Sequence, residues 1–203
     1  MLGSLVDMTS DLIAAAESGN LDEVKRLVET GAELNAQDDR GRTAVMAATH
    51  GNHPAVVEYL LAKGADVNLR DEMSDNPLLY AGAEGLLEIV RICLAAGADT
   101  KLTNRYGGIA IIPASERGHV DVVRELLTNS DTNVNHINRL GWTALLEAVV
   151  LADGGPKHQA IVQLLVDHGA DINIRDKNGE TALELATRRG LKEIVAILAK
   201  AEA

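Results

Sequence analysis

Large aromatic side chains are nearly missing from this sequence. Its 203 residues include no Phe, one Trp and three Tyr. A single thick globular core usually contains several of these rings, because each one buries a large apolar area. Small and medium-sized apolar residues make up most of the 46% hydrophobic content instead. This composition favours thin layers of closely packed helices over one large core.

Signals for disulfides and membrane insertion are missing as well. The single cysteine, Cys93, excludes an internal disulfide, and no run of about twenty apolar residues is present to cross a bilayer. The segment 1–8 lacks the basic region and the apolar run of a signal peptide, and we interpret it as an N-terminal tail or tag remnant. We therefore expect a soluble cytoplasmic protein, or a periplasmic one if a signal peptide has been removed.

Positive charge is in short supply. The chain has 19 Lys and Arg against 30 Asp and Glu, which gives a net charge of −11. Nucleic-acid binding and attraction to an anionic membrane both depend on Lys and Arg. We therefore expect no nucleic-acid partner and no membrane partner.

Residues suited to catalysis or metal binding do not gather in any recognisable pattern. Of the six His, only His50 and His53 lie close together, and no third ligand accompanies them at the spacing of a metal site. Cys93 lies between Ile92 and Leu94 on the apolar side of a predicted helix, where a core thiol is expected. No Gly-rich phosphate loop or nucleophile elbow is present. We expect no catalytic residue, no metal and no cofactor.

The sequence does contain an internal repeat with a period close to 33 residues. A Gly-Ala pair followed by an acidic residue begins at Gly31, Gly64, Gly97 and Gly169. A Gly-x-Thr-Ala segment begins at Gly41, Gly141 and Gly179. Residues of a type that ends helices recur at Gly19, Asn52, Gly85, Gly118 and Gly190.

Each repeat is predicted to contain two helices of opposite direction. Thr43, Thr143 and Thr181 stand where the first helix begins, and their hydroxyls are suited to cap its free amides. Apolar residues within 86–96 recur at intervals of three and four, which predicts a second helix with one buried side, ended by Gly97. No repeat can bury both of its faces alone, so stacking must supply the core.

These phased motifs resemble the ankyrin repeat, over roughly residues 9 to 200. The resemblance implies an all-α repeat solenoid, an ankyrin-like stack of about six helix-turn-helix repeats with β-hairpin fingers. We expect a single ankyrin-repeat domain over 9–203, with repeats at 9–37, 38–70, 71–103, 104–137, 138–175 and 176–203.

The chain departs from the family pattern in three ways. The T-P-L-H segment loses its His, which usually ties neighbouring fingers together. Pro113 falls inside the first helix of the fourth repeat, where it costs little in the first turn and would kink the helix if deeper. An insertion near 152–158 is expected to form a surface loop between the helices of the fifth repeat, with Pro156 starting the second helix. This loop either serves binding or is simply tolerated.

The resemblance also implies where a partner would bind, because ankyrin-like stacks generally bind through the finger tips and the exposed turn of the first helix. The candidate residues are apolar, aromatic or Arg positions of the central repeats: Met73, Arg105, Tyr106, Arg117, Arg139, Leu140, Trp142, Val150 and Leu151. Aromatic and Arg residues dominate binding hot spots, which favours a partner site on repeats three to five centred on Trp142 and Tyr106. The alternative is that these side chains pack against adjacent fingers in place of the lost His network.

The sequence therefore favours a monomeric adaptor or scaffold that binds an unidentified partner protein. Two other functions stay open. A purely structural or designed repeat protein is one, although the irregular fourth and fifth repeats argue against a design that copies a consensus. An enzyme on a repeat scaffold is the other, and it would need a convergent pocket of titratable residues that the sequence does not supply.

Overall fold

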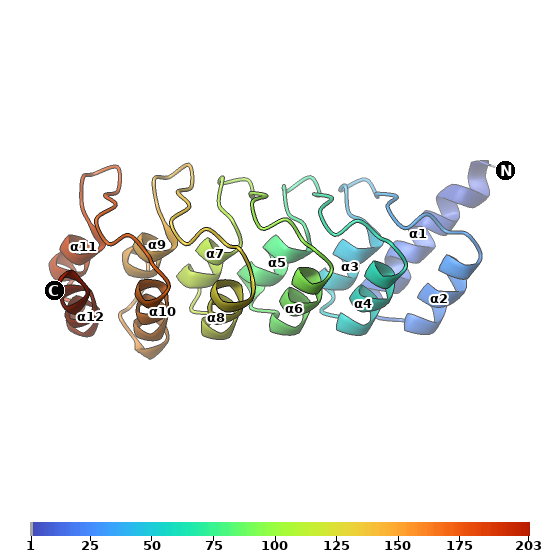
Figure 1. Cartoon of the computed structure of the whole chain (residues 1–203). Helices are drawn as coiled ribbons and strands as arrows, with labels where there is room; N and C mark the ends of the chain where they lie inside the picture. Colours follow the sequence, from blue (N-terminus) through green and yellow to red (C-terminus); the bar gives the residue numbers. More distant parts are fainter. Residues whose placement is uncertain (1) are drawn as a thin grey trace. The chain divides into compact units, whose positions relative to one another are not determined.

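The computed structural model describes residues 2–203, and the side chains of residues 7–203. Twelve α-helices and no strand are found within this range (Figure 1). The first helices of the successive pairs are α1 (Leu2–Ser18), α3 (Ala44–His50), α5 (Pro77–Glu84), α7 (Ile111–Glu116), α9 (Ala144–Val150) and α11 (Ala182–Arg188). The second helices are α2 (Leu21–Glu29), α4 (Pro54–Ala62), α6 (Leu87–Ala95), α8 (Val120–Asn129), α10 (Pro156–Asp167) and α12 (Lys192–Glu202). None of the described helices is long and apolar enough to cross a membrane.

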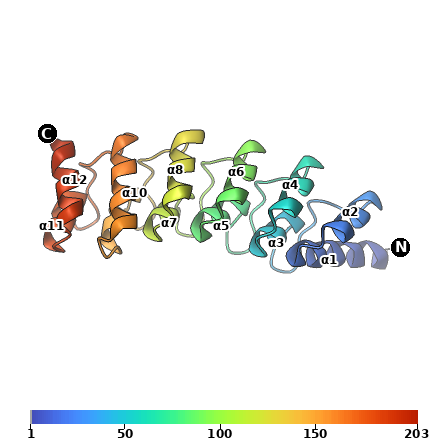
Figure 2. The same ribbon diagram turned by 90° about the horizontal axis from the view of Figure 1, so that it is seen from below.

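The helices are grouped into two compact units. The first unit runs to Ala81 and includes Glu88–Asp99, and the second consists of Gly82–Leu87 and Thr100–Ala203. In the first unit α1 packs against α2 and α3, and α3 packs against α4. In the second unit α7, α9 and α11 form one layer while α8, α10 and α12 form the other (Figures 1 and 2). Each unit buries its apolar residues between these layers, as stacked repeats require.

Side-chain caps fix where four of the first helices begin, namely α3, α5, α9 and α11. The Oγ1 atoms of Thr43 and Thr143 each accept a hydrogen bond at 3.2 Å from the backbone amide three residues later. Thr181 forms a capping box with Glu184, because each residue's side chain accepts from the other's backbone amide. Asn76 caps α5 in the same way at 3.0 Å. The predicted capping role of the three Thr residues is confirmed.

The predicted helix ends are also confirmed. Asn52 has a φ of 55°, which places it in the left-handed region that its short polar side chain tolerates. Gly85 has a φ of 75° at the corresponding place. A Cβ at Gly85 would lie 2.6 Å from His119 Nδ1, so only Gly fits there. The ring of His119 is held above this turn because its Nε2 lies 2.9 Å from the carbonyl oxygen of Ala83.

The predicted β-hairpin fingers are not confirmed, since residues 2–203 include no strand. The loops that lead into the first helices are closed by Asx turns instead. In the loop 104–108, Asn104 Oδ1 accepts from the amides of Tyr106 and Gly108 at 2.9 and 3.1 Å, and one backbone bond joins Asn104 N to Gly108 O. The same turn recurs at 38–42, 71–75, 138–142 and 176–180. We call these five segments the finger turns.

The irregular repeats keep the helical frame. Pro113 is the third residue of α7 and therefore lies in the first turn, where it removes no helical hydrogen bond. Pro156 begins α10, as predicted, and Ala152 is buried. The insertion 152–158 is thus a surface loop only in part, because its last three residues belong to α10. Residues 2–8 belong to α1, and the interpretation of the segment 1–8 as a tail or tag remnant stays a prediction.

Candidate functional site

The finger turns of the second unit are tied into one row. The backbone amide of Arg139 donates to the carbonyl oxygen of Tyr106 at 2.9 Å, and Arg139 Nη1 donates to the carbonyl oxygen of Arg105 at 2.9 Å. Lys177 Nζ donates to the carbonyl oxygen of Arg139 at 2.8 Å. Each turn therefore holds the next one. We call the turns 104–108, 138–142 and 176–180 the finger row.

Close packing also fixes the backbone of the finger row. His136 Nε2 lies 2.7 Å from the carbonyl oxygen of Gly107, an arrangement that requires the ring proton on Nε2. Gly107 has a φ of 71°, and a Cβ there would lie 2.8 Å from Arg139 Cγ. The stem of Arg139 thus crosses directly over the preceding turn. A surface held in this way loses little conformational freedom when a partner binds.

Several large apolar side chains remain exposed on the second unit. Their exposed fractions are 50% for Tyr106, 50% for Ile137, 47% for Leu140 and 57% for Leu151. Sequence reasoning missed Ile137. A signal for it existed, because the residue just before the Asx position of the finger turn is polar in every other repeat: Gln37, Arg70, Thr103 and Arg175. Exposed large apolar side chains next to charged residues are typical of an interaction surface.

The structure brings together some of the predicted site residues and separates others. Arg105, Tyr106, Arg139 and Leu140 lie on the finger row, and Trp142 lies at its base with its side chain half-buried. The other predicted residues of the second unit, Arg117, Val150 and Leu151, lie at the ends of first helices. Met73 is exposed on the first unit and is therefore not part of the finger row.

Arg117 has a local structural role at the end of a first helix. Its Nη1 donates to the carbonyl oxygen of Ala83 at 3.2 Å and to Glu84 Oε1 at 2.8 Å. Arg189, at the corresponding place two repeats later, donates to the carbonyl oxygens of Val149 and Val150. Both guanidinium groups satisfy carbonyl groups that a helix end leaves unpaired. The guanidinium of Arg117 also forms an ion pair with the carboxylate of Glu84.

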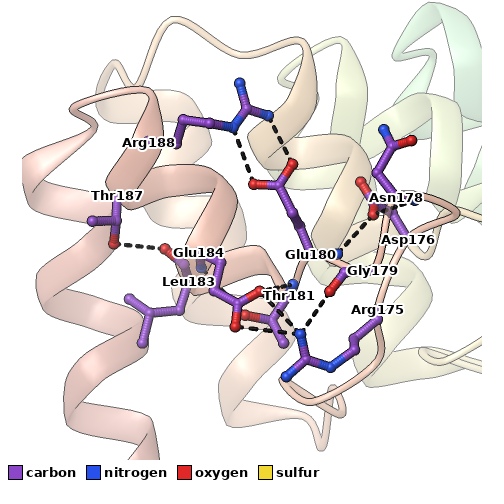
Figure 3. A network of polar contacts seen from close by, with 10 residues as sticks. All are labelled: Arg175, Asp176, Asn178, Gly179, Glu180, Thr181, Leu183, Glu184, Thr187 and Arg188. Atoms are coloured by element: carbon purple, nitrogen blue, oxygen red, sulfur yellow. Dashed lines mark hydrogen bonds and ion pairs between the residues drawn. The ribbon is translucent and has the colours of Figure 1, made fainter.

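The last repeat uses its charges internally. Arg175 Nη1 lies 3.0 Å from Glu184 Oε2, and Arg188 Nε lies 3.0 Å from Glu180 Oε2 (Figure 3). Four charges are therefore matched in pairs around the capping box of α11. The cation at the tip of this finger turn, Lys177, is bound to a neutral carbonyl oxygen instead.

A buried acid lies between the first helices of the second unit. The side chain of Glu147 on α9 is only 5% exposed, and its Oε2 has no hydrogen-bond partner among the described residues. Burial, followed by repulsion from Glu116, raises the pKa of Glu147 to about 7. Ser115 Oγ on α7 is likewise buried without a partner within residues 7–203.

The single thiol of the chain is also buried. Cys93 is fully buried, and burial raises the pKa of its thiol to about 12, so the nucleophilic thiolate is disfavoured. No group of three or more His, Cys, Asp or Glu among the described residues could hold a metal ion. These observations leave the finger row as the best-defined candidate surface.

Comparison with known proteins agrees with this architecture. A family model described as "Ankyrin repeats (3 copies)" matches residues 12–104, 78–176 and 113–203. The Escherichia coli (strain K12) protein YahD, itself described as an ankyrin repeat protein, is 43% identical over 200 residues, which cover 98% of this chain and 100% of YahD.

Two crystal structures have the same fold. An ankyrin repeat domain from Acinetobacter baumannii AYE superimposes with a TM-score of 0.91 at 47% identity, covering 95% of this chain and 97% of that domain. The ankyrin repeat domain of Bcl-3, a member of the IkappaB protein family, gives a TM-score of 0.86 at 27% identity, covering 95% and 86% of the two chains. The chain belongs to the ankyrin repeat family.

Proposed function

We propose that this chain is a protein-interaction module, an adaptor or scaffold, that binds a partner protein through the finger row and the adjoining first helices of its second unit. The proposal rests mainly on one observation. Tyr106 and Leu140 are about half exposed on turns that hydrogen bonds fix in place. Large apolar side chains on a rigid surface are the usual anchors of an interface.

The family gives this proposal further support, because ankyrin repeats are generally protein-interaction modules. The proposal assigns no catalytic step to any residue. We also propose that the chain is monomeric and cytoplasmic, as expected from the sequence. Size-exclusion chromatography with light scattering would test the monomer, and a dimer that buries Tyr106 would contradict it.

The single Trp offers a direct measurement of binding. Trp142 lies half-buried at the base of the finger row, so its fluorescence should change when a partner covers the row. A partner isolated by affinity capture would be identified, purified and titrated against the wild-type chain. The double variant Tyr106→Ala/Leu140→Ala should weaken its affinity at least ten-fold, because truncating two anchors removes roughly 1 to 2 kcal/mol each.

A matched control comes from the first unit. Met73 also lies on a finger turn, and it is 46% exposed, so Met73→Ala removes a comparable apolar side chain outside the finger row. This variant should bind within two-fold of wild type. Equal affinity of the double variant and of wild type, with unchanged circular dichroism, would refute the proposed surface.

A further inference from the structure

The charge at the tips of the finger turns differs between the two units. The residue after the Asx position is Asp39 or Glu72 in the first unit, and Arg105, Arg139 or Lys177 in the second. The whole chain carries a net charge of −11, so a run of three cations at one repeated position stands out against its surroundings. Such local clusters attract partners of opposite charge.

The hydrogen bonds of two of these cations position their charge without neutralising it. Arg139 donates to the backbone carbonyl oxygen of Arg105, and Lys177 donates to that of Arg139. These backbone carbonyl groups carry no net charge. The neighbouring Arg175 and Arg188 are different, since each forms an ion pair with a Glu (Figure 3). The finger row therefore presents cations that are fixed in place and still able to attract a carboxylate.

Apolar surface lies between these charges. The guanidinium carbon of Arg105 lies 4.8 Å from the ring centroid of Tyr106, so the two side chains form one cation–π pair. Leu140 is exposed on the next finger turn, and Ile137 is exposed just before that turn. A binding surface that alternates cations with apolar side chains matches a ligand that alternates acidic and apolar groups.

The spacing of the row limits the shape of that ligand. Stacked helices pack roughly 10 Å apart, so corresponding tips recur at about this interval. A partner segment in the extended polyproline II conformation has three residues per turn and advances roughly 3.1 Å per residue, so every third side chain faces the row again at about this interval. A nucleic acid backbone is a poorer match, because the exposed Leu140 and Ile137 contribute nothing to phosphate binding.

From this pattern we propose that the finger row binds an extended acidic segment of the partner protein, with a carboxylate at every third residue and an apolar side chain between carboxylates. This inference rests on the proposed function and specifies its partner. Arg139 and Lys177 bind the carboxylates. Tyr106 and Leu140 contact the apolar side chains.

Fluorescence anisotropy with synthetic peptides tests the proposal. The probe is a fluorescein-labelled peptide with Glu at every third position and Leu between them. One comparison peptide has Gln in place of each Glu, and another has the same composition with the Glu residues adjacent. We expect the first peptide to bind at least ten-fold more tightly than either comparison peptide, and its affinity to fall as salt rises.

Matched variants locate the binding on the row. Arg139→Gln/Lys177→Gln should weaken binding of the acidic peptide at least ten-fold, and thermal unfolding checks that the variant folds. Lys192→Gln/Lys200→Gln makes the same change in net charge at exposed residues of α12 and should alter affinity less than two-fold.

Three results would overturn the inference. They are failure of the acidic peptide to bind, equal binding of the Gln peptide, or tighter binding of a single-stranded oligonucleotide that is lost in the Arg139→Gln/Lys177→Gln variant. None of them refutes the proposed protein-interaction function, which fails separately if Tyr106→Ala/Leu140→Ala leaves partner affinity unchanged.

Discussion

Glu147 should make the stability of the second unit depend on pH. Its side chain is 5% exposed, one carboxylate oxygen has no hydrogen-bond partner among the described residues, and its pKa is raised to about 7. The change to test is Glu147→Gln, which keeps the size of the side chain and removes its charge. Burial is the main cause of the raised pKa, and the charge of Glu116 is the second.

The sign and size follow from the two pKa values. Below the unfolded value of 4.5 the carboxyl is protonated in both states and its burial carries no charge penalty. As the pH rises towards the folded value of about 7, the unfolded chain ionises first, so unfolding becomes more favourable. Above that pH the full penalty applies, and a difference of this size corresponds to about 3 kcal/mol. About 2 kcal/mol of this loss in the free energy of unfolding occurs between about pH 5.5 and pH 8.5.

Urea unfolding of both proteins across this pH range is the measurement. The stability of Glu147→Gln minus that of wild type should rise by about 2 kcal/mol from the acidic to the basic end, because all other titrating groups cancel in the difference. Glu116→Gln should lower the pH dependence of wild type in part. Glu193→Gln, at an exposed position on α12, is the matched control and should give a flat difference. A flat difference for Glu147→Gln as well would refute the reasoning.

Three further predictions test other parts of the chain. Iodoacetamide should leave Cys93 unmodified in the native state and alkylate it in urea, as mass spectrometry would detect, because the thiol is buried and its pKa is about 12. Gly85→Ala should lower the melting temperature more than Gly179→Ala, since both φ values are positive but only the first Cβ meets a neighbouring ring; equal losses would contradict this. Arg42→Gln should cost about 1 to 2 kcal/mol in urea unfolding, because its buried guanidinium pairs with two carboxylates; a neutral effect would contradict it.

The repeat period predicts the helices well because local chemistry sets their ends. Thr143 can cap only the amides that follow it, and Gly85 or Asn52 can end a helix wherever the left-handed conformation is needed. These effects act within four residues and are therefore visible in the sequence. Departure from the T-P-L-H segment says less about where a helix begins, because Asn76 caps α5 in place of a Thr.

The fingers were predicted less well, although part of the signal was present. Asp or Asn stands three residues before the positive-φ residue of every finger turn, as in Asn104 with Gly107 and Asp71 with Ser74. That spacing is typical of an Asx turn. A β-hairpin needs several backbone pairs in succession along two strands, whereas each finger turn is closed within five residues by two backbone bonds and the Asx side chain. The expectation of strands came from the family resemblance and not from these residues.

The direction of a side chain is what the sequence leaves open, and Arg139 illustrates the consequence. Its place on a finger tip fits two roles, contact with a partner or a link to the preceding finger. The structure provides the link, because its guanidinium donates to the carbonyl oxygen of Arg105. Lys177 repeats this link one finger later. A neutral carbonyl oxygen holds a cation in place and leaves its charge available, so the link and the contact are compatible in one residue. A hydrogen bond to a carboxylate, as in Arg188, would instead have used that charge within the fold.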